Sequence, residues 1–212
     1  SRKGIGDRLS TLQNTATSEW SECDMNGRVL LTGFEPFGGN PTNVSWDVVQ
    51  AVNRAMPEVT YAQLLPVDYL QARLELTESL AEKQPAGCLC LGLGRPGSLA
   101  FETRARKPEQ FPAFPGPEIL ATAWPTEEIL SAAADAQLPA RVSEDAGQYV
   151  CESTFWAALE FRERLGQPEW GAFVHLPPET AVFTLERLVR CVTDIVRRRL
   201  AAGGCPASLA HL

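Results

Sequence analysis

The chain has 212 residues, of which 44% are hydrophobic and 21% charged, the composition of a globular protein that can bury one full core. Its formal net charge of -7 makes nucleic acid a poor candidate partner, and no run approaches the roughly 20 apolar residues that a membrane-spanning helix needs. Residues 1–26 are polar and lack the apolar segment of a secretory signal, so we expect an N-terminal extension on a cytoplasmic protein.

The first part of the sequence alternates short apolar runs with segments of helical spacing. In chain order it predicts a strand at 28–32, a Gly- and Pro-rich loop at 33–43, a helix at 45–53, a strand at 59–67 and a helix at 68–83. Asp68 stands where its carboxylate can cap the second helix, so we expect that helix to begin there.

The second part continues this alternation after one long interruption. It predicts strands at 87–93 and 99–104, a Pro-rich loop or lid at 107–125, a helix at 126–136, a strand at 140–142, a helix at 151–165, a strand at 172–176 and a helix at 181–200. The run at 99–104 alternates apolar and polar residues, which is typical of a half-exposed strand. Thr126 is the expected cap of the helix that follows the loop.

Strands that alternate with helices favour an α/β fold. We predict a single domain over 27–212, with a mostly parallel, twisted sheet sandwiched by helices. Functional sites in such folds lie beyond the carboxyl ends of the strands. The loops after Thr32, Leu93 and His175 are therefore expected to surround the site.

The six cysteines are expected to be reduced thiols, because a chain of this size needs no disulfides to hold a core. Cys88 and Cys90 lie two apart in an apolar run and are interpreted as small buried residues. Only two histidines and no paired Cys-x-x-Cys occur, so we predict no metal site, and nothing in the sequence calls for a cofactor.

A thiol, an imidazole and a carboxylate are candidates for a catalytic set. His175 ends an apolar run, whereas His211 lies next to the C-terminus, so His175 is the better candidate base. Taken alone, however, the pattern favours a core histidine bonded to a main-chain carbonyl. Cys151 follows a turn-like stretch and starts a helix, where main-chain N–H groups can stabilise a thiolate and an oxyanion; the alternative is a small buried helix residue. Cys191 lies inside a helix and lacks that setting. Glu102 could orient the imidazole, or it could face solvent.

The loop after the first strand carries Phe34 and Phe37 between glycines. Two phenylalanines there either fill the core or wall an apolar ligand. The loop lacks the lysine of a P-loop, which argues against phosphate binding and against a phosphorylase-like transferase suggested by fold analogy alone.

Three motifs together resemble the pyroglutamyl peptidase I family of cysteine peptidases. They are Leu-Thr-Gly-Phe-Glu-Pro-Phe-Gly-Gly at 31–39, followed by Asn43 and Ser45-Trp46; Asp-Ala-Gly-Gln-Tyr-Val-Cys at 145–151; and Gly-Ala-Phe-Val-His-Leu-Pro at 171–177. The segment at 92–95 and Glu102 resemble the part of the family that bears its glutamate. The resemblance extends over about 28–200.

This resemblance implies an α/β/α fold and an exopeptidase that removes N-terminal pyroglutamate from peptides through an acyl-enzyme. It implies that Cys151 attacks the carbonyl, that His175 transfers the proton and that Glu102 orients His175. Phe34 and Phe37 would wall the lactam ring, with Asn43 also at the substrate site. A homotetramer or homodimer is the implied assembly.

The sequence also departs from the family pattern. Leu93 lies where many members carry a glutamine, Val44 replaces a common proline, and the segment 103–107 offers more than one arginine for a family arginine near the site. These departures leave an alternative: a catalytically degenerate module that binds pyroglutamyl or lactam-like ligands on the same scaffold.

Overall fold

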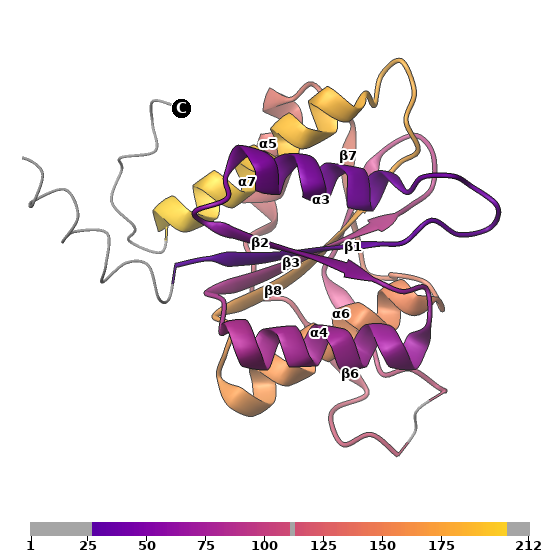
Figure 1. The fold of residues 1–212 in the computed structure, drawn as a ribbon, viewed down its shortest axis with the longest axis vertical. Helices are drawn as coiled ribbons and strands as arrows, with labels where there is room; N and C mark the ends of the chain where they lie inside the picture. Colours follow the sequence, from indigo (N-terminus) through magenta and orange to yellow (C-terminus); the bar gives the residue numbers. More distant parts are fainter. Residues whose placement is uncertain (1–26, 111–112, 203–212) are drawn as a thin grey trace, which may run out of the picture.

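The computed structural model describes residues 27–110 and 113–202, so the polar segment 1–26 lies outside the described residues. The elements in chain order are β1 (Val29–Phe34), α3 (Val44–Ala55), β2 (Thr60–Leu65), α4 (Tyr69–Lys83), β3 (Gly87–Leu93), β4 (Leu99–Glu102), β5 (Arg104–Arg106), β6 (Ile119–Ala121), α5 (Thr126–Asp135), β7 (Ala140–Ser143), α6 (Val150–Leu165), β8 (Trp170–Leu176) and α7 (Leu185–Ala202). Figure 1 shows the sheet edge-on between two layers of helices.

The main sheet has the strand order β2-β1-β3-β8-β4-β7. The first four strands of that order are parallel, β4 runs antiparallel to β8, and β7 is parallel to β4. The α/β fold predicted from the alternating pattern is therefore confirmed, with a mixed sheet that is mostly parallel. The antiparallel pairing places the N-terminal end of β4 beside the C-terminal end of β8.

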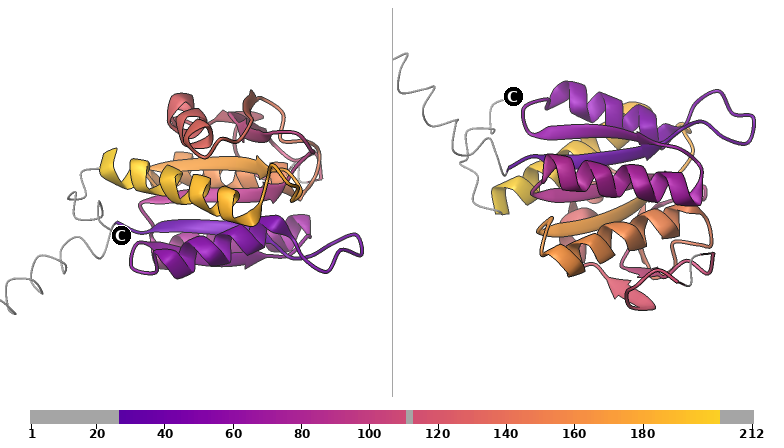
Figure 2. Two further views of the ribbon diagram at one scale, coloured as in Figure 1. Left: turned by 90° about the horizontal axis from the view of Figure 1, so that it is seen from above. Right: turned by 60° about the horizontal axis from the view of Figure 1, so that its bottom comes forward.

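Helices cover both faces of the sheet, as the two turned views in Figure 2 show. Helices α3, α5 and α7 pack on one face and α4 and α6 on the other. Central strands are buried on both sides, so neighbouring residues of one strand enter different cores: Leu31 packs with the first group of helices and Leu30 with the second. No helix in the described ranges is long and apolar enough to cross a membrane.

The start of α3 is fixed by a polar cap and a close approach to β1. Asn43 Oδ1 accepts hydrogen bonds from Ser45 N at 3.1 Å and from Ser45 Oγ at 2.9 Å. A Cβ on Gly33 would lie 2.8 Å from main-chain atoms of Ser45 and Trp46, so only glycine lets the helix sit this close to the strand. The Gly-rich motif thereby fixes where β1 ends and α3 begins.

The helix caps test two predictions from the sequence. Asp68 does cap α4, because its carboxylate accepts hydrogen bonds from Leu70 N and Gln71 N. The prediction for Thr126 was wrong: α5 begins at that residue, with Pro125 at the cap position and no side-chain cap hydrogen bond.

The strand expected to be half-exposed at 99–104 is in fact divided. β4 is buried along its whole length because it lies between β8 and β7, and the chain then continues as the separate strand β5. Within the Pro-rich segment 107–125, expected to be a loop, β6 forms an antiparallel pair with β5. Trp156 Nε1 donates a hydrogen bond to Pro117 O at 3.0 Å, which holds this segment against α6.

Candidate active site

All six residues predicted for the site line one pocket of about 840 Å³. They are Phe34, Phe37, Asn43, Glu102, Cys151 and His175. The pocket lies beyond the carboxyl ends of β1, β3 and β8, where the sheet topology leads us to expect it. Its volume is within the range of small-ligand sites, about 300–1,000 Å³.

The structure places Glu102 against His175. Glu102 ends β4 and His175 is the penultimate residue of β8. The antiparallel register pairs Glu102 with Phe173, so Glu102 and His175, two residues further along β8, lie diagonally on the same face of the sheet. Glu102 Oε1 lies 2.8 Å from His175 Nδ1, so Nδ1–H donates to the carboxylate and Nε2 is left for proton exchange. The His175 ring also packs against Phe173, with a distance of 4.8 Å between ring centroids.

Burial distinguishes Glu102 from the solvent-facing side chain that its strand pattern suggested. Its exposed fraction is 1%, and that of the His175 side chain is 13%. The solvent-facing alternative is wrong because β7 covers the outer side of β4. Glu102 Oε2 has no hydrogen-bond partner within the described part of the chain, so the imidazole is its principal polar contact.

Cys151 lies in the first turn of α6, as the sequence predicted. Tyr149 occupies the N-cap position, and its carbonyl accepts from Glu152 N at 3.1 Å. A Cβ on Gly92 would lie 3.0 Å from Cys151 Sγ, and Gly92 is the register partner of His175. The same Cβ would lie 2.8 Å from the Phe173 ring, so glycine at this position of β3 leaves room for both the ring and the thiol.

The Cys151 thiol is half-buried, and opposing effects act on its pKa. Burial raises the pKa of Cys151 to about 12, while its own main-chain N–H lowers it, and the charges of Cys90, Glu102 and Glu152 raise it further. Loss of hydration thus opposes the stabilising field of the helix start, and a low-pKa thiolate at Cys151 stays a prediction.

Two phenylalanines form apolar parts of the pocket wall. Phe34, the last residue of β1, has an exposed fraction of 2%, and its main-chain N–H donates to Ser45 Oγ at 3.0 Å. Phe37 is 43% exposed and lies in the loop between β1 and α3. The pocket thus has one buried aromatic wall, Phe34, and one solvent-accessible aromatic wall, Phe37.

Asn43 lines the pocket but also serves the fold. Its Oδ1 is the cap of α3, and its Nδ2 donates to Glu35 O at 3.0 Å. Glu35 Oε1 in turn accepts from Val67 N at 3.0 Å, which ties the loop to the chain that follows β2. These bonds hold the Phe-bearing loop in one position beside the pocket.

Several lining residues were not singled out from the sequence. They include Arg95, Arg141, Ser143, Tyr69 and Tyr149. Arg141 comes from β7, and only the strand order reveals that β7 lies beside β4. Tyr149, in contrast, could have been found, since it lies within the motif that ends at Cys151.

Comparison with known proteins agrees with this arrangement. The sequence profile of the pyroglutamyl peptidase family matches residues 27–104 and 103–197. The pyrrolidone-carboxylate peptidase of Yersinia pestis is 33% identical over 176 residues, covering 73% of this chain and 81% of the relative. That of Thermococcus kodakarensis is 31% identical over 166 residues, covering 71% and 81%.

Solved structures show the same relationship. The pyrrolidone carboxyl peptidase of Fervidobacterium islandicum superposes with a TM-score of 0.71 at 27% identity, covering 81% of this chain and 97% of that one. Pyroglutamyl peptidase I of Bacillus amyloliquefaciens gives a TM-score of 0.70 at 25% identity, covering 83% and 98%. The resemblance, the fold and the enzyme class predicted from the sequence are thereby confirmed: the chain belongs to the pyroglutamyl peptidase family of cysteine peptidases.

Proposed function

We propose that this protein hydrolyses the amide bond after an N-terminal pyroglutamate, with Cys151 as nucleophile, His175 as general acid–base and Glu102 as the group that orients His175. The observation that carries the proposal is the buried hydrogen bond of 2.8 Å between Glu102 and His175 in the same pocket as Cys151. A pure binding site has no need for a thiol and an oriented imidazole together.

The chemistry follows from the state of the thiol. Burial raises the pKa of Cys151, which favours the thiol, so His175 Nε2 takes its proton as Sγ attacks the carbonyl carbon of pyroglutamate, and Glu102 stabilises the imidazolium that forms. The main-chain N–H at Cys151 can donate to the developing oxyanion.

Collapse of this intermediate breaks the C–N bond, and the leaving amine takes the proton from His175. The pyroglutamyl group is then bound to Cys151 as a thioester. Water, deprotonated by His175, attacks that thioester, and the thiol leaves with a proton returned by the imidazole.

Selectivity follows from the absence of charge on the lactam. Phe34 and Phe37 offer flat apolar surfaces to the ring. An ordinary N-terminal residue would bring an ammonium group against these walls, at a free-energy cost that a neutral lactam avoids.

The test is release of 7-amino-4-methylcoumarin from pyroglutamyl-7-amido-4-methylcoumarin under reducing conditions. We expect turnover by the wild type and a loss of more than about a thousandfold in Cys151→Ala. Cys191→Ala is the matched control, since Cys191 lies in α7 and does not line the pocket, and it should retain turnover. Binding of pyroglutamate without any turnover by the wild type would instead establish the degenerate binding module.

Assembly as a homodimer or homotetramer and a cytoplasmic location stay predictions. Light scattering coupled to size-exclusion chromatography would measure the assembly directly.

A further inference from the structure

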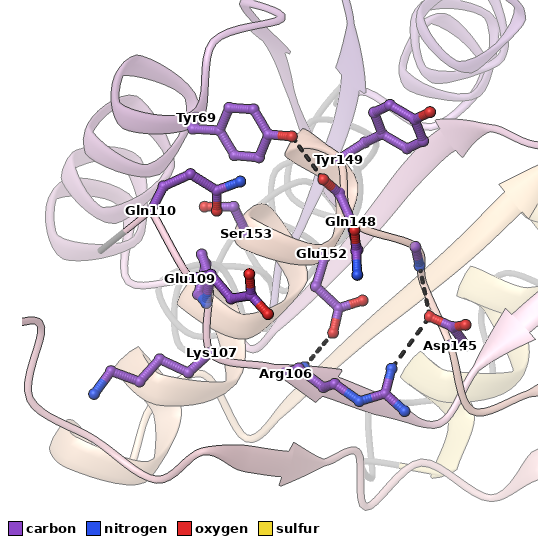
Figure 3. A pocket seen from close by; sticks show the side chains of 12 residues that line it. Tyr69, Arg106, Lys107, Glu109, Gln110, Asp145, Gln148, Tyr149, Glu152 and Ser153 are labelled. Atoms are coloured by element: carbon purple, nitrogen blue, oxygen red, sulfur yellow. Dashed lines mark hydrogen bonds and ion pairs between the residues drawn. The ribbon is translucent and has the colours of Figure 1, made fainter. Parts of the chain in front are cut away.

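A second pocket of about 390 Å³ lies beside the catalytic one (Figure 3). The two pockets share four lining residues: Tyr69, Asp145, Gly147 and Tyr149. The second pocket is also lined by Glu152, which follows Cys151 directly in the chain. A peptide whose first carbonyl reaches Cys151 therefore has this pocket immediately next to its scissile bond.

The walls of the second pocket come from three segments that are distant in sequence. They are the start of α4 at Tyr69, residues 106–110, which begin at the last residue of β5, and residues 145–153, which form a turn and the first turn of α6. Tyr69 Oη donates to Gln148 O at 2.7 Å, which ties α4 to the turn before α6, and Gly147 N donates to Asp145 Oδ1 at 3.1 Å within that turn. The pocket is thus a feature of the packed fold.

The cations of this pocket already have carboxylate partners. Arg106 lies 3.2 Å from Asp145, and Lys107 lies 3.6 Å from Glu118. Two further lining carboxylates, Glu109 and Glu152, form no ion pair within the described ranges. The pocket therefore has an excess of negative charge.

Glu152 is the more unusual of these two carboxylates. Its exposed fraction is 6%, and Oε1 accepts a hydrogen bond from the main-chain N–H of Arg106. Oε2 has no partner among the described residues. In Figure 3 the carboxyl groups of Glu109 and Glu152 point into the same region of the view, above Arg106.

We propose that this second pocket is the subsite for the leaving peptide, and that it favours a cationic side chain at the first or second residue after pyroglutamate. The inference rests on the proposed function. A lysine or arginine side chain entering the pocket would compensate the charge that Glu109 and Glu152 leave unpaired. Tyr69 and Tyr149 line both pockets, and their rings suit the alkyl part of such a side chain.

The experiment compares kcat/KM for matched peptides. The first pair, pyroglutamyl-lysyl-alaninamide and its norleucine analogue, differs only in charge at the first residue, and a second pair moves lysine and norleucine to the second residue. We expect the lysine peptide of one pair to be preferred by about tenfold at pH 7.5 and low salt, as for a partly buried charge pair.

Three variants locate the source of that preference. In Glu152→Gln the ratio of lysine to norleucine should fall toward one, and in Glu109→Gln it should fall partway. Glu163→Gln, exposed on the same helix α6, is the matched control and should keep the wild-type ratio. The lysine-to-norleucine ratio of kcat/KM is compared because Glu152 is next to Cys151 in the chain. A change in the reactivity of the thiol would alter both rates and leave their ratio unchanged.

Lowering the pH gives a readout that needs no variant. Burial raises the pKa of Glu152 to about 6. The hydrogen bond from the main chain of Arg106 and the charge of its side chain lower this pKa, whereas the charges of Asp145 and Glu102 raise it. The lysine preference should therefore weaken as the pH falls through about 6. In Glu109→Gln, whose exposed side chain is not needed for folding, the remaining preference should show the same decline.

The outcomes separate the inference from the function on which it rests. Absence of turnover with the coumarin amide, which has no side chain after pyroglutamate, would refute the proposed function. Turnover of that amide with a lysine-to-norleucine ratio near one at both positions would overturn the subsite alone. A ratio that survives unchanged in both Glu152→Gln and Glu109→Gln would overturn it as well.

Discussion

Two buried carboxylates flank the Cys151 thiol, and their partners differ. Glu102 ends β4 and contacts the side chain of His175, a group that can exchange a proton. Glu152 lies in the first turn of α6 and accepts from the main chain of Arg106, a donor that stays protonated. Each leaves its Oε2 without a partner in the described part of the chain.

The comparison shows that burial and proximity do not by themselves make a carboxylate catalytic. Both charges raise the pKa of Cys151. Only Glu102 is hydrogen-bonded to a residue that can carry a proton to and from the reacting atoms. This difference supports the proposed roles of Glu102 in the chemistry and of Glu152 in the neighbouring subsite.

The largest expected effect is that of Glu102→Gln on turnover. The amide keeps the shape but loses the charge that stabilises the imidazolium, so kcat should fall about a thousandfold with little change in KM. Coumarin release from the pyroglutamyl amide measures this, with Glu163→Gln as the control. The loss in Glu152→Gln should be at least about ten times smaller; equal losses would erase the distinction between the two carboxylates.

The next effect concerns the pH dependence of folding. The folded-state pKa of Glu152 is raised from 4.5 to about 6, so the protonated form is favoured on folding, and this contribution to stability is lost as the pH rises through about 6. A pKa shift of that size lowers the free energy of unfolding of the wild type by about 2 kcal/mol between pH 4 and pH 7.

Glu152→Gln should therefore gain about 2 kcal/mol in free energy of unfolding relative to the wild type over that pH interval. Urea unfolding at several pH values measures the difference, and Glu163→Gln should remain parallel to the wild type. A difference between Glu152→Gln and wild type that does not vary with pH would show that Glu152 titrates as an ordinary carboxyl.

The smallest effect is on the reactivity of the thiol, and here the two carboxylates should act alike. Because the pKa of Cys151 is about 12, alkylation by iodoacetamide should still accelerate about tenfold per pH unit up to pH 9. Removing either charge should lower that pKa and raise the rate at pH 8 a few-fold.

Peptide mass spectrometry after timed alkylation gives these rates for each cysteine. Cys191, which is fully buried in α7, is the internal control and should stay unlabelled in the folded protein. A rate for Cys151 that reaches a plateau below pH 8 would mean that the resting thiol is already ionised.

The sequence predicted the parts of the site that depend on local pattern. Alternating apolar runs indicated the α/β fold, the turn before Cys151 indicated a helix start, and the end of an apolar run marked His175. The same reasoning supplied the cap at Asp68, because an Asx cap needs only the residues that follow it.

What the sequence missed depends on which elements lie side by side. The burial of Glu102 requires β7 as the neighbour of β4, and the pocket position of Arg141 has the same cause. Glu152 looks like an ordinary acidic residue of a first helical turn, and it is buried only because β5 packs against α6. The effect of burial on the Cys151 thiol was missed for a related reason, since a helix start is visible in the sequence and the burial of its side chains is not.

The most direct test of the account is affinity labelling with pyroglutamyl chloromethyl ketone, in which a thiol sulfur displaces chloride and forms a carbon–sulfur bond. If the pocket holds pyroglutamate against Cys151, the label should be found on Cys151 alone, and free pyroglutamate should slow its attachment. Inactivation with the label on any other residue, or full labelling that leaves coumarin release intact, would contradict the assignment of Cys151 as the nucleophile.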